Sequence, residues 1–132
     1  MAPGQLLVLG RSATRADFQT YWQTSFGSDV VYLDAALAGG GVPNVNGGET
    51  WALVSPVGTV LDVTIAGENK DSCYHRESGG SGTSPSSWSE GDMSSGRPGA
   101  TALPTSGVGL VFSQWCDAEI YQYEFLELYY AP

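Results

Sequence analysis

Residues 119–132, EIYQYEFLELYYAP, decide the fold that we expect of this chain. From Tyr123 to Tyr130 the side chains alternate between two sets, and both sets carry aromatic or apolar groups. A period of two is typical of a β-strand, and apolar groups on both faces are typical of a strand covered on both sides. Because an exposed strand of this kind would pair with other strands, we expect it not to be a free edge. The strand residues singled out for burial or assembly are Tyr123, Phe125, Leu126, Leu128, Tyr129 and Tyr130.

The composition predicts one globular β-rich domain over residues 1–132. The 42% hydrophobic content favours a packed core, while 18 glycines and 7 prolines favour many turns, as in β-sandwiches and barrels. Fourteen acidic residues against five basic ones give a net charge of -9, which would repel a phosphate backbone or an anionic membrane. We therefore do not expect nucleic acid as a partner. We also expect no membrane insertion, because no apolar stretch is long enough to span a bilayer.

Turn-forming residues separate the expected elements in the first half of the chain. The runs QLLVLGR and DVVYLD predict two strands, and SATRADFQTYW between them predicts a short helix capped by Ser12 or Thr14. ALAGGGVPNVNGGE is typical of a loop. The run ETWALVSPVGTVLDVTIAG predicts a β-hairpin that turns at SPVG.

The second half begins with a stretch that cannot build its own core. Residues 79–107 are rich in Ser, Gly and Pro, so we expect a long surface loop and connection pinned by Trp88. The alternating pattern returns over residues 108–130 and predicts the last strands of the domain.

Several of these segments resemble lamin tail domains. APGQLLVLGRSATRADFQTYW resembles the family's strand and Arg-then-Phe helix, and NGGETWALVSPVGTVLD is similar to its hairpin around a glycine turn. CYHRESGGSGTSPSSWSEGDMSSGRPGA resembles its closing stretch, where an Arg, a Trp and a terminal Pro-Gly recur. The resemblance implies an immunoglobulin-like β-sandwich that acts as a non-catalytic module, in bacteria on secreted or surface proteins.

The order of these segments differs from the family pattern. GLVFSQWCDAEIYQYEFLELYYAP is similar to the strands that open a lamin tail domain, yet here it closes the chain, and the family's next hairpin is absent. The last strands are therefore expected to fold back within the chain, as in a circular permutant, or to complete the sheet of a neighbour. We slightly favour the neighbour, because the missing hairpin would leave a closed sandwich short of strands.

Two cysteines, Cys73 and Cys116, lie in different segments. Their spacing allows a disulfide or two buried thiols. We predict that they lie close enough to bridge, which would close a loop of about 40 residues and contribute roughly 3 to 4 kcal/mol. A bridge would fit an extracellular or cell-surface location. The start, MAPGQLLVLGR, lacks the features of a signal peptide, so a secreted form would be shown here without its signal.

Catalytic and metal-binding patterns are weak. His75 is the single histidine, and no GxSxG turn accompanies it, so we expect no enzyme activity. The two cysteines lack the CxxC spacing of a zinc site, and no cofactor is expected. Two acidic pairs with oxygens for calcium lack the pattern of a dedicated calcium loop, and a solvated acidic surface is the favoured interpretation. These weak candidates are Glu90, Asp92, Asp117 and Glu119.

The tryptophans support the main alternative function. Trp22 and Trp88 are candidates for stacking against a polysaccharide, although the favoured interpretation places Trp51 and Trp115 in the core and uses Trp88 to pin its loop. Two function classes follow. The first is a non-catalytic structural module that associates with itself through its C-terminal strands, as an oligomer or fibre. The second is an extracellular binding module for a polysaccharide or a protein partner.

Overall fold

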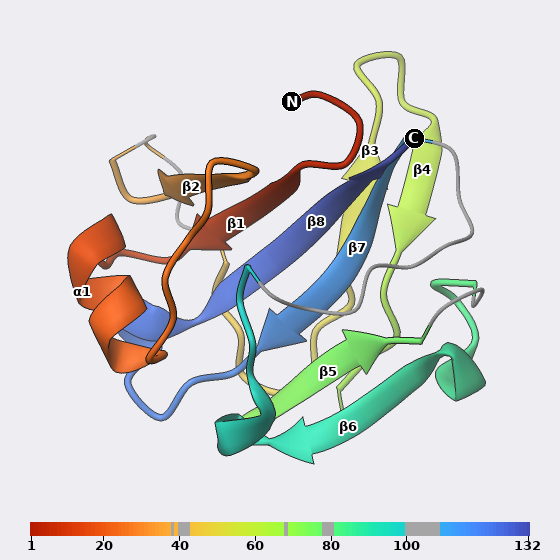
Figure 1. Ribbon diagram of the computed structural model, residues 1–132. Helices are drawn as coiled ribbons and strands as arrows, with labels where there is room; N and C mark the ends of the chain where they lie inside the picture. The colour runs from red at the N-terminus through yellow and green to blue at the C-terminus, as the bar shows by residue number, and fades with distance from the viewer. Residues whose placement is uncertain (38, 40–42, 68, 78–80, 100–108) are drawn as a thin grey trace.

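The computed structural model describes residues 1–37, 39, 43–67, 69–77, 81–99 and 109–132. In this part of the chain, eight strands form a six-stranded sheet and a two-stranded sheet, accompanied by one α-helix (Figure 1). The predicted all-β class with one short helix is confirmed, while the immunoglobulin-like assignment stays a prediction. The elements are β1 (Leu6–Gly10), α1 (Arg15–Tyr21), β2 (Val30–Asp34), β3 (Ala52–Val54), β4 (Val60–Val63), β5 (Ser72–Arg76), β6 (Trp88–Asp92), β7 (Gly109–Cys116) and β8 (Phe125–Ala131), with 3-10 turns η1 (Pro85–Ser87), η2 (Met93–Ser95) and η3 (Tyr121–Tyr123).

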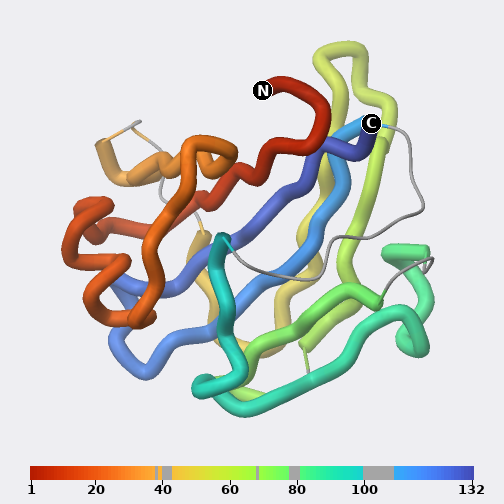
Figure 2. The backbone as a smooth tube through the Cα atoms, in the orientation of Figure 1, coloured from red at the N-terminus to blue at the C-terminus, as the bar shows by residue number. Residues whose placement is uncertain are grey.

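Strand β8 lies in the middle of the large sheet. The strand order is β2-β1-β8-β7-β5-β6, and β8 pairs antiparallel with β1 on one edge and with β7 on the other. Both edges of β8 are thus occupied within the chain, and the two termini lie at the same end of the sheet (Figure 2). Within the single chain, the structure therefore shows β8 paired in cis, while exchange with a neighbour, which we slightly favoured, stays a prediction.

The two faces of β8 contribute to two separate cores. Phe125 and Tyr129 pack with residues of α1 and β1 on one face, and Leu126 and Leu128 pack with the β3–β4 hairpin on the other. The alternation in the sequence produces this division, because successive side chains of a strand point to opposite faces. Tyr130, which we expected to be buried, is only half-buried.

A carboxylate is buried inside the face that packs on the helix. Glu127 has no exposed surface, yet its two carboxylate oxygens accept hydrogen bonds from the Ser113 hydroxyl at 2.8 Å and the Gly99 N–H at 2.6 Å. Because a buried charge is costly unless it is hydrogen-bonded, these partners explain how β8 keeps an acid at this position. The contact also ties residues 96–99 to the sheet.

The segment from β1 to β2 forms a parallel crossover. β1 pairs parallel with β2, and α1 lies in the connection between them. Two parallel strands need such a crossover, because the chain must return to the same end of the sheet before the second strand begins. Thr14 caps α1, since its hydroxyl accepts a hydrogen bond from the Asp17 N–H at 3.2 Å. The predicted helix and its Thr14 cap are confirmed. No helix in the described residues is long and apolar enough to cross a membrane.

Part of the predicted loop is a strand. Residues 88–92 form β6, which pairs antiparallel with β5 at the edge of the large sheet. The composition hid this strand, because an edge strand with one solvated face can be built from Ser, Glu, Gly and Asp. Trp88 does anchor the segment: it is 7% exposed, and its indole N–H donates to the Gly82 carbonyl at 2.9 Å. Residues 79–80 and 100–108 of the predicted loop and connection lie outside the described residues.

The predicted hairpin is present as β3 and β4. The turn at SPVG closes with a hydrogen bond from the Gly58 N–H to the Ser55 carbonyl at 2.9 Å, and Gly58 has a positive φ of 85°. Glycine adopts this backbone conformation without steric cost. The hairpin packs its Leu53 side chain against the core formed by Leu126 and Leu128.

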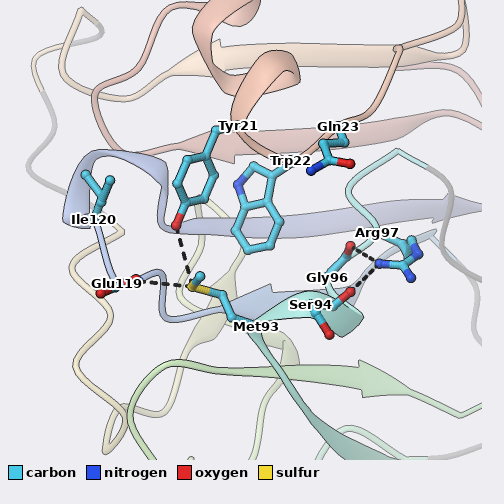
Figure 3. A pocket seen from close by; sticks show the side chains of 9 residues that line it. All are labelled: Tyr21, Trp22, Gln23, Met93, Ser94, Gly96, Arg97, Glu119 and Ile120. Atoms are coloured by element: carbon cyan, nitrogen blue, oxygen red, sulfur yellow. Dashed lines mark hydrogen bonds between the residues drawn. The ribbon is translucent and has the colours of Figure 1, made fainter.

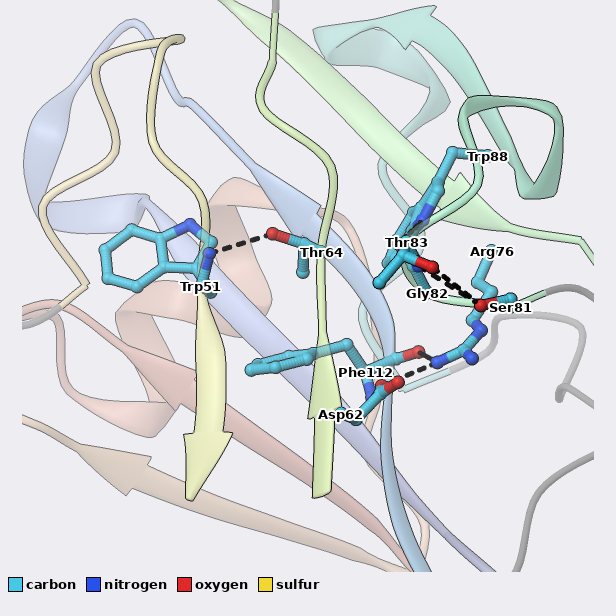
Figure 4. Close-up of polar contacts among 9 residues, drawn as sticks. All are labelled: Trp51, Asp62, Thr64, Arg76, Ser81, Gly82, Thr83, Trp88 and Phe112. Atoms are coloured by element: carbon cyan, nitrogen blue, oxygen red, sulfur yellow. Dashed lines mark hydrogen bonds and ion pairs between the residues drawn. The ribbon is translucent and has the colours of Figure 1, made fainter. Parts of the chain in front are cut away.

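A buried ion pair fastens the hairpin to the large sheet (Figure 4). The Asp62 carboxylate on β4 accepts hydrogen bonds from the Arg76 guanidinium at 2.6 Å and from the Phe112 N–H at 2.8 Å. Arg76 also donates to the Phe112 carbonyl at 3.2 Å. One charge pair therefore joins β4, β5 and β7.

Cys73 and Cys116 form a disulfide between β5 and β7. The two residues are direct partners in the antiparallel register, and their Cα atoms are 4.2 Å apart. Both cysteines are fully buried on the face covered by α1. The bridge thus holds the β5–β6 pair to the centre of the sheet.

Candidate functional site

A groove of about 550 Å³ opens where the end of α1, turn η2 and the segment before η3 meet (Figure 3). Side chains from three distant parts of the sequence meet there because β8 carries the η3 segment back to the helix that follows β1. The groove is lined by Tyr21, Trp22, Gln23, Met93, Ser94, Gly96, Arg97, Glu119 and Ile120.

Trp22 is held in a fixed orientation at the end of α1. Its indole N–H donates to the Tyr123 carbonyl at 3.0 Å, and its ring meets the Phe125 ring edge-on at 5.2 Å between centroids. The side chain is half-buried, so one part of the ring belongs to the core and another part lines the groove. A binding side chain that is locked by packing loses little entropy when a ligand arrives.

Tyr21 connects the other two segments. Its ring stacks on the Tyr123 ring at 4.0 Å with an interplanar angle of 7°, and its hydroxyl donates to the Met93 sulfur at 3.5 Å. The same sulfur accepts the Glu119 N–H at 3.2 Å. Burial raises the pKa of the Tyr21 hydroxyl, and the nearby Glu119 charge raises it too, so the hydroxyl stays neutral at physiological pH.

Polar groups lie on the rim of the groove. The Arg97 guanidinium donates to the Ser94 carbonyl at 2.6 Å and to the Gly96 carbonyl at 2.8 Å, which fixes one end of this planar group. Glu119 is exposed at the opposite side, and Gln23 lies beside Trp22. The rim therefore offers hydrogen-bond donors and acceptors around an aromatic and thioether floor.

Glycine is required at position 96. A Cβ atom there would collide with the Trp22 ring and would lie 3.1 Å from the Cys73 sulfur. Residues 93–97 can therefore close against Trp22, above the disulfide, only with the bare backbone of Gly96. The wall of the groove depends on this close approach.

The structure separates the residues that the sequence analysis proposed for ligand stacking. Trp22 lines the groove, whereas Trp88 is 7% exposed, packs with Phe112 and Leu126 under the opposite face, and lines a separate hollow there. Trp88 is thus a core residue, as the favoured interpretation of the sequence placed it, and its role in stacking stays a prediction. Pairing of β6 with β5 places the Trp88 ring against the sheet, and burying so large an apolar surface is favourable.

The weak calcium candidates are not brought together. Glu90 accepts a hydrogen bond from the Asn69 amide at 2.7 Å, Asp92 accepts one from the Ser94 hydroxyl at 2.5 Å, and Asp117 is buried. Glu119 alone among the four lines the groove. Among the described residues, no group of three or more His, Cys, Asp or Glu side chains could hold a metal ion.

Most residues of the groove were not identified as a site from the sequence. These residues come from segments that lie far apart in the chain, and none belongs to a recognisable motif; they include Tyr21, Met93, Arg97 and Ile120. The one usable signal was Trp22, a large aromatic residue at the end of a short helix. Its partners became visible only when the sheet order was known.

His75 lies on β5 outside the groove. Its Nε2 atom is 3.2 Å from the Ser95 hydroxyl, and the side chain is half-buried. Burial lowers the pKa of His75 from its ordinary value of 6.5, and the Arg97 charge lowers it further, while the Glu77 charge acts in the opposite direction. The folded protein therefore favours the neutral imidazole.

We expect His75 to make the fold sensitive to mild acid. In the unfolded chain the imidazole takes up a proton near pH 6.5, whereas in the folded chain it does so only at lower pH. Stability contributed by the neutral ring is complete above pH 6.5 and is lost as the pH falls from there toward the folded pKa. The melting temperature of His75→Gln should therefore fall less between pH 7 and pH 5.5 than that of the unaltered chain.

Comparing the unaltered chain with His75→Gln removes the contribution of two carboxyl groups whose effect on stability changes with pH in the opposite direction. Burial raises the pKa values of Asp117 and Glu124, so these carboxyls favour folding as the pH falls toward their unfolded values, in both proteins alike. Melting temperatures measured by calorimetry at the two pH values isolate the imidazole. Equal acid shifts in the two proteins would show that His75 does not titrate in this way.

Comparison with protein families, curated proteins and solved structures found no match for this chain.

Proposed function

We propose that this chain is a non-catalytic extracellular binding module that holds a neutral polysaccharide in the groove around Trp22. The observation that carries the proposal is the arrangement of Trp22: a ring locked by the Tyr123 carbonyl and the Phe125 ring, with one part facing the groove. Side chains with hydrogen-bonding groups stand around it from three segments. This is the second function class suggested by the sequence, with one of its two candidate tryptophans.

Carbohydrate is the ligand chemistry that fits the groove best. A sugar ring presents apolar C–H groups on its faces and hydroxyls around its edge. The indole of Trp22 can stack against a face, while Gln23, Arg97 and Glu119 can bond to the hydroxyls. A volume of about 550 Å³ lies within the range of small-ligand sites.

The charge of the chain favours a neutral polymer. With a net charge of -9 and Glu119 on the rim, the protein repels polyanions such as uronic-acid polymers. Arg97 is the one cation among the described residues that line the groove, and its guanidinium is already engaged by two carbonyls. Neutral glucans, xylans and mannans avoid this repulsion.

The ionisable groups of the groove support binding without catalysis. Hydrolysis of a glycosidic bond ordinarily uses two carboxyl groups on either side of the bond. Among the described residues that line the groove, Glu119 is the one carboxylate. The raised pKa of Tyr21 also makes its hydroxyl a poor base at neutral pH. A non-catalytic role agrees with the lamin tail resemblance, which we retain as a proposal.

The Cys73–Cys116 disulfide supports an extracellular or cell-surface location. Disulfides persist in oxidising compartments and are rare in the reducing cytosol. Structural association through β8, the first function class, loses its motive because both edges of β8 are paired in cis. We therefore place the polysaccharide proposal first.

Affinity electrophoresis tests the proposal with two groove variants. We expect the unaltered chain to be retarded in native gels containing a soluble β-glucan, an arabinoxylan or a mannan, and not in gels containing alginate. Trp22→Leu should weaken binding at least about tenfold, since losing a stacking ring costs on the order of 1.4 kcal/mol. Arg97→Ala should weaken it by a smaller factor through the loss of hydrogen bonds to hydroxyls.

Arg15→Ala is the matched control for Arg97→Ala. It removes the same charge from an exposed arginine of α1 that does not line the groove. Melting curves of all variants show whether Trp22→Leu is still folded. The proposal fails if none of the neutral polymers retards the unaltered chain, or if folded Trp22→Leu and Arg97→Ala bind as well as Arg15→Ala does.

A further inference from the structure

A second hollow lies on the face of the large sheet that packs with the β3–β4 hairpin, opposite the face covered by α1. It has a volume of about 670 Å³ and opens between the end of β4, strands β5 and β6, and turn η1. Figure 4 shows Thr64 on one side of it and Thr83 and Trp88 on the other. Trp88, the second stacking candidate from the sequence, therefore borders a site that the groove around Trp22 does not include.

Close backbone packing fixes the walls of this hollow. A Cβ atom at Gly82 would collide with the Val63 carbonyl oxygen, so the segment before η1 can approach β4 this closely only because it has glycine there. The Gly82 carbonyl accepts the indole N–H of Trp88 at 2.9 Å. The Tyr74 ring stacks on the Trp115 ring with 4.1 Å between centroids. The lining is thus ordered before a ligand arrives, which limits the entropy lost on binding.

Most of the lining is apolar. The walls carry aliphatic side chains from the end of β4, the residues after it and η1, namely Val63, Ile65, Ala66 and Pro85. Tyr74 and Trp88 are 2% and 7% exposed, so neither ring shows enough of its face for a sugar to stack on it. A hydrocarbon group fits this interior better than a sugar does, because its burial removes apolar surface from water.

A carboxylate stands at the rim. Among the described residues that line the hollow, Glu90 is the one charged side chain, and it is exposed. The Asn69 amide donates to this carboxylate at 2.7 Å and holds the pKa of Glu90 below its ordinary value. The hydroxyls of Ser72 and Tyr74 lower the pKa further, while slight burial acts in the opposite direction. The hollow therefore carries a full negative charge at neutral pH.

The surrounding charges favour a cation as the ligand. Arg76 lies 5.9 Å from the Trp88 ring centroid, yet its charge is matched by the Asp62 carboxylate at 2.6 Å. The net charge of -9 makes the potential around the chain negative and attracts cations to it. A ligand that suits both the interior and the rim carries a positive charge at one end of an apolar body.

We propose that this hollow binds a primary ammonium ion on an apolar body, with the ammonium at Glu90 and the body between Ile65, Pro85 and Trp88. The N–H groups of the ammonium donate to the carboxylate and to threonine hydroxyls of the lining. A free amine and the lysine side chain of a peptide both present this chemistry. The hollow is separate from the groove around Trp22, so the proposal can fail while the polysaccharide proposal holds.

NMR titrations with probes of one shape and different charge test the proposal. Phenethylamine is a cation at pH 7, 2-phenylethanol is neutral and phenylacetate is an anion. We expect phenethylamine to bind in the millimolar range and about twofold to fivefold tighter than 2-phenylethanol, as an exposed ion pair allows. Phenylacetate should bind most weakly. The shifts should lie in residues 63–66 and 83–90, and the Trp22 indole signal should not move.

Two variants and a matched control locate the site. Glu90→Gln should bind phenethylamine only as tightly as 2-phenylethanol, whose own affinity stays unchanged. Glu77→Gln removes the same charge from an exposed acid that does not line the hollow, and it should bind phenethylamine as the unaltered chain does. Ala66→Trp places a large side chain at an exposed position of the wall and should weaken binding of all the probes. Melting curves establish that each variant is folded.

A further probe, Nα-acetyl-lysine methylamide, distinguishes the two sources of the ammonium. Weaker binding of this probe than of phenethylamine supports a free amine, and tighter binding supports a peptide lysine. The proposal is overturned if phenethylamine shifts no signal of residues 63–66 and 83–90, or if it binds no tighter than 2-phenylethanol. Equal losses in Glu90→Gln and Glu77→Gln would attribute the attraction to the net charge and would overturn the site as well.

Discussion

A chain that lacks residues 125–132 should be unfolded at every concentration. These residues include all of β8, which lies between β1 and β7, and six of its seven side chains are buried. Removing it leaves two sheet edges unpaired and opens both cores. Each large apolar side chain lost contributes about 1.5–3 kcal/mol of burial, so their sum is comparable to the net stability of a typical domain, about 5–15 kcal/mol.

Circular dichroism and the dispersion of amide signals in NMR spectra measure this outcome. The matched control is deletion of Pro132 alone, an exposed residue outside β8, which should fold normally. If the deletion variant is folded and its spectra become identical to those of the intact chain only when a peptide of residues 125–132 is added, β8 is exchanged between chains and does not close the sheet in cis. A folded deletion variant with no need of the peptide would contradict the central position of β8.

Arg76→Leu should destabilise the fold by about 3–5 kcal/mol, the usual cost of removing one partner of a buried ion pair. Arg76 is 6% exposed, and its guanidinium is 2.6 Å from the Asp62 carboxylate. Without it, the buried carboxylate keeps the hydrogen bond from the Phe112 N–H but loses its charge partner. Arg76→Leu also removes the guanidinium that lies 5.9 Å from the Trp88 ring centroid.

Urea unfolding of Asp62→Leu and of two further variants separates charge from packing. Arg76→Leu combined with Asp62→Leu should recover much of the lost stability, since replacing both charges leaves no uncompensated carboxylate. Arg15→Leu, a change at an exposed arginine, should cost less than about 1 kcal/mol. If the two single changes at the ion pair add up in the double variant, the pair is not coupled and the account of how the hairpin is fastened is wrong.

Local patterns predicted much of the secondary structure. The β8 strand, the capped helix and the hairpin each have a period or a turn signal within a few residues, and all three are present. The strand prediction was wrong at its start: Tyr123 belongs to the 3-10 turn η3, and β8 begins at Phe125. Strand β6 was missed because Trp88 is its one large apolar side chain, and an edge strand can do without the alternation that marks a central strand. Strand β5 has two partners and was not predicted either, whereas β2, β3 and β4 have one partner each and were predicted, so an apolar or alternating run, and not the number of partners, revealed a strand.

Strand order was beyond the sequence. The place of β8 beside β1 joins segments more than 100 residues apart, and the parallel β1–β2 pair joins two strands separated by a helix; no local signal specifies either pairing. The same limit applies to the groove, which exists because the η3 segment returns to the end of α1. Trp22 could be proposed as a binding residue, whereas Met93 and Arg97 could be added only from the arrangement in space.

The most direct test of the proposed function is an NMR titration of the full, disulfide-intact chain with neutral hexasaccharides of the β-glucan, xylan and mannan types. With at least one of them, we predict concentration-dependent shifts in the Trp22 indole N–H signal and in the amides of Gln23, Arg97 and Ile120, while the signals of residues 50–61 in the β3–β4 hairpin stay unchanged. Shifts that cluster away from the groove, or spectra that do not change with any hexasaccharide, would contradict the polysaccharide-binding function.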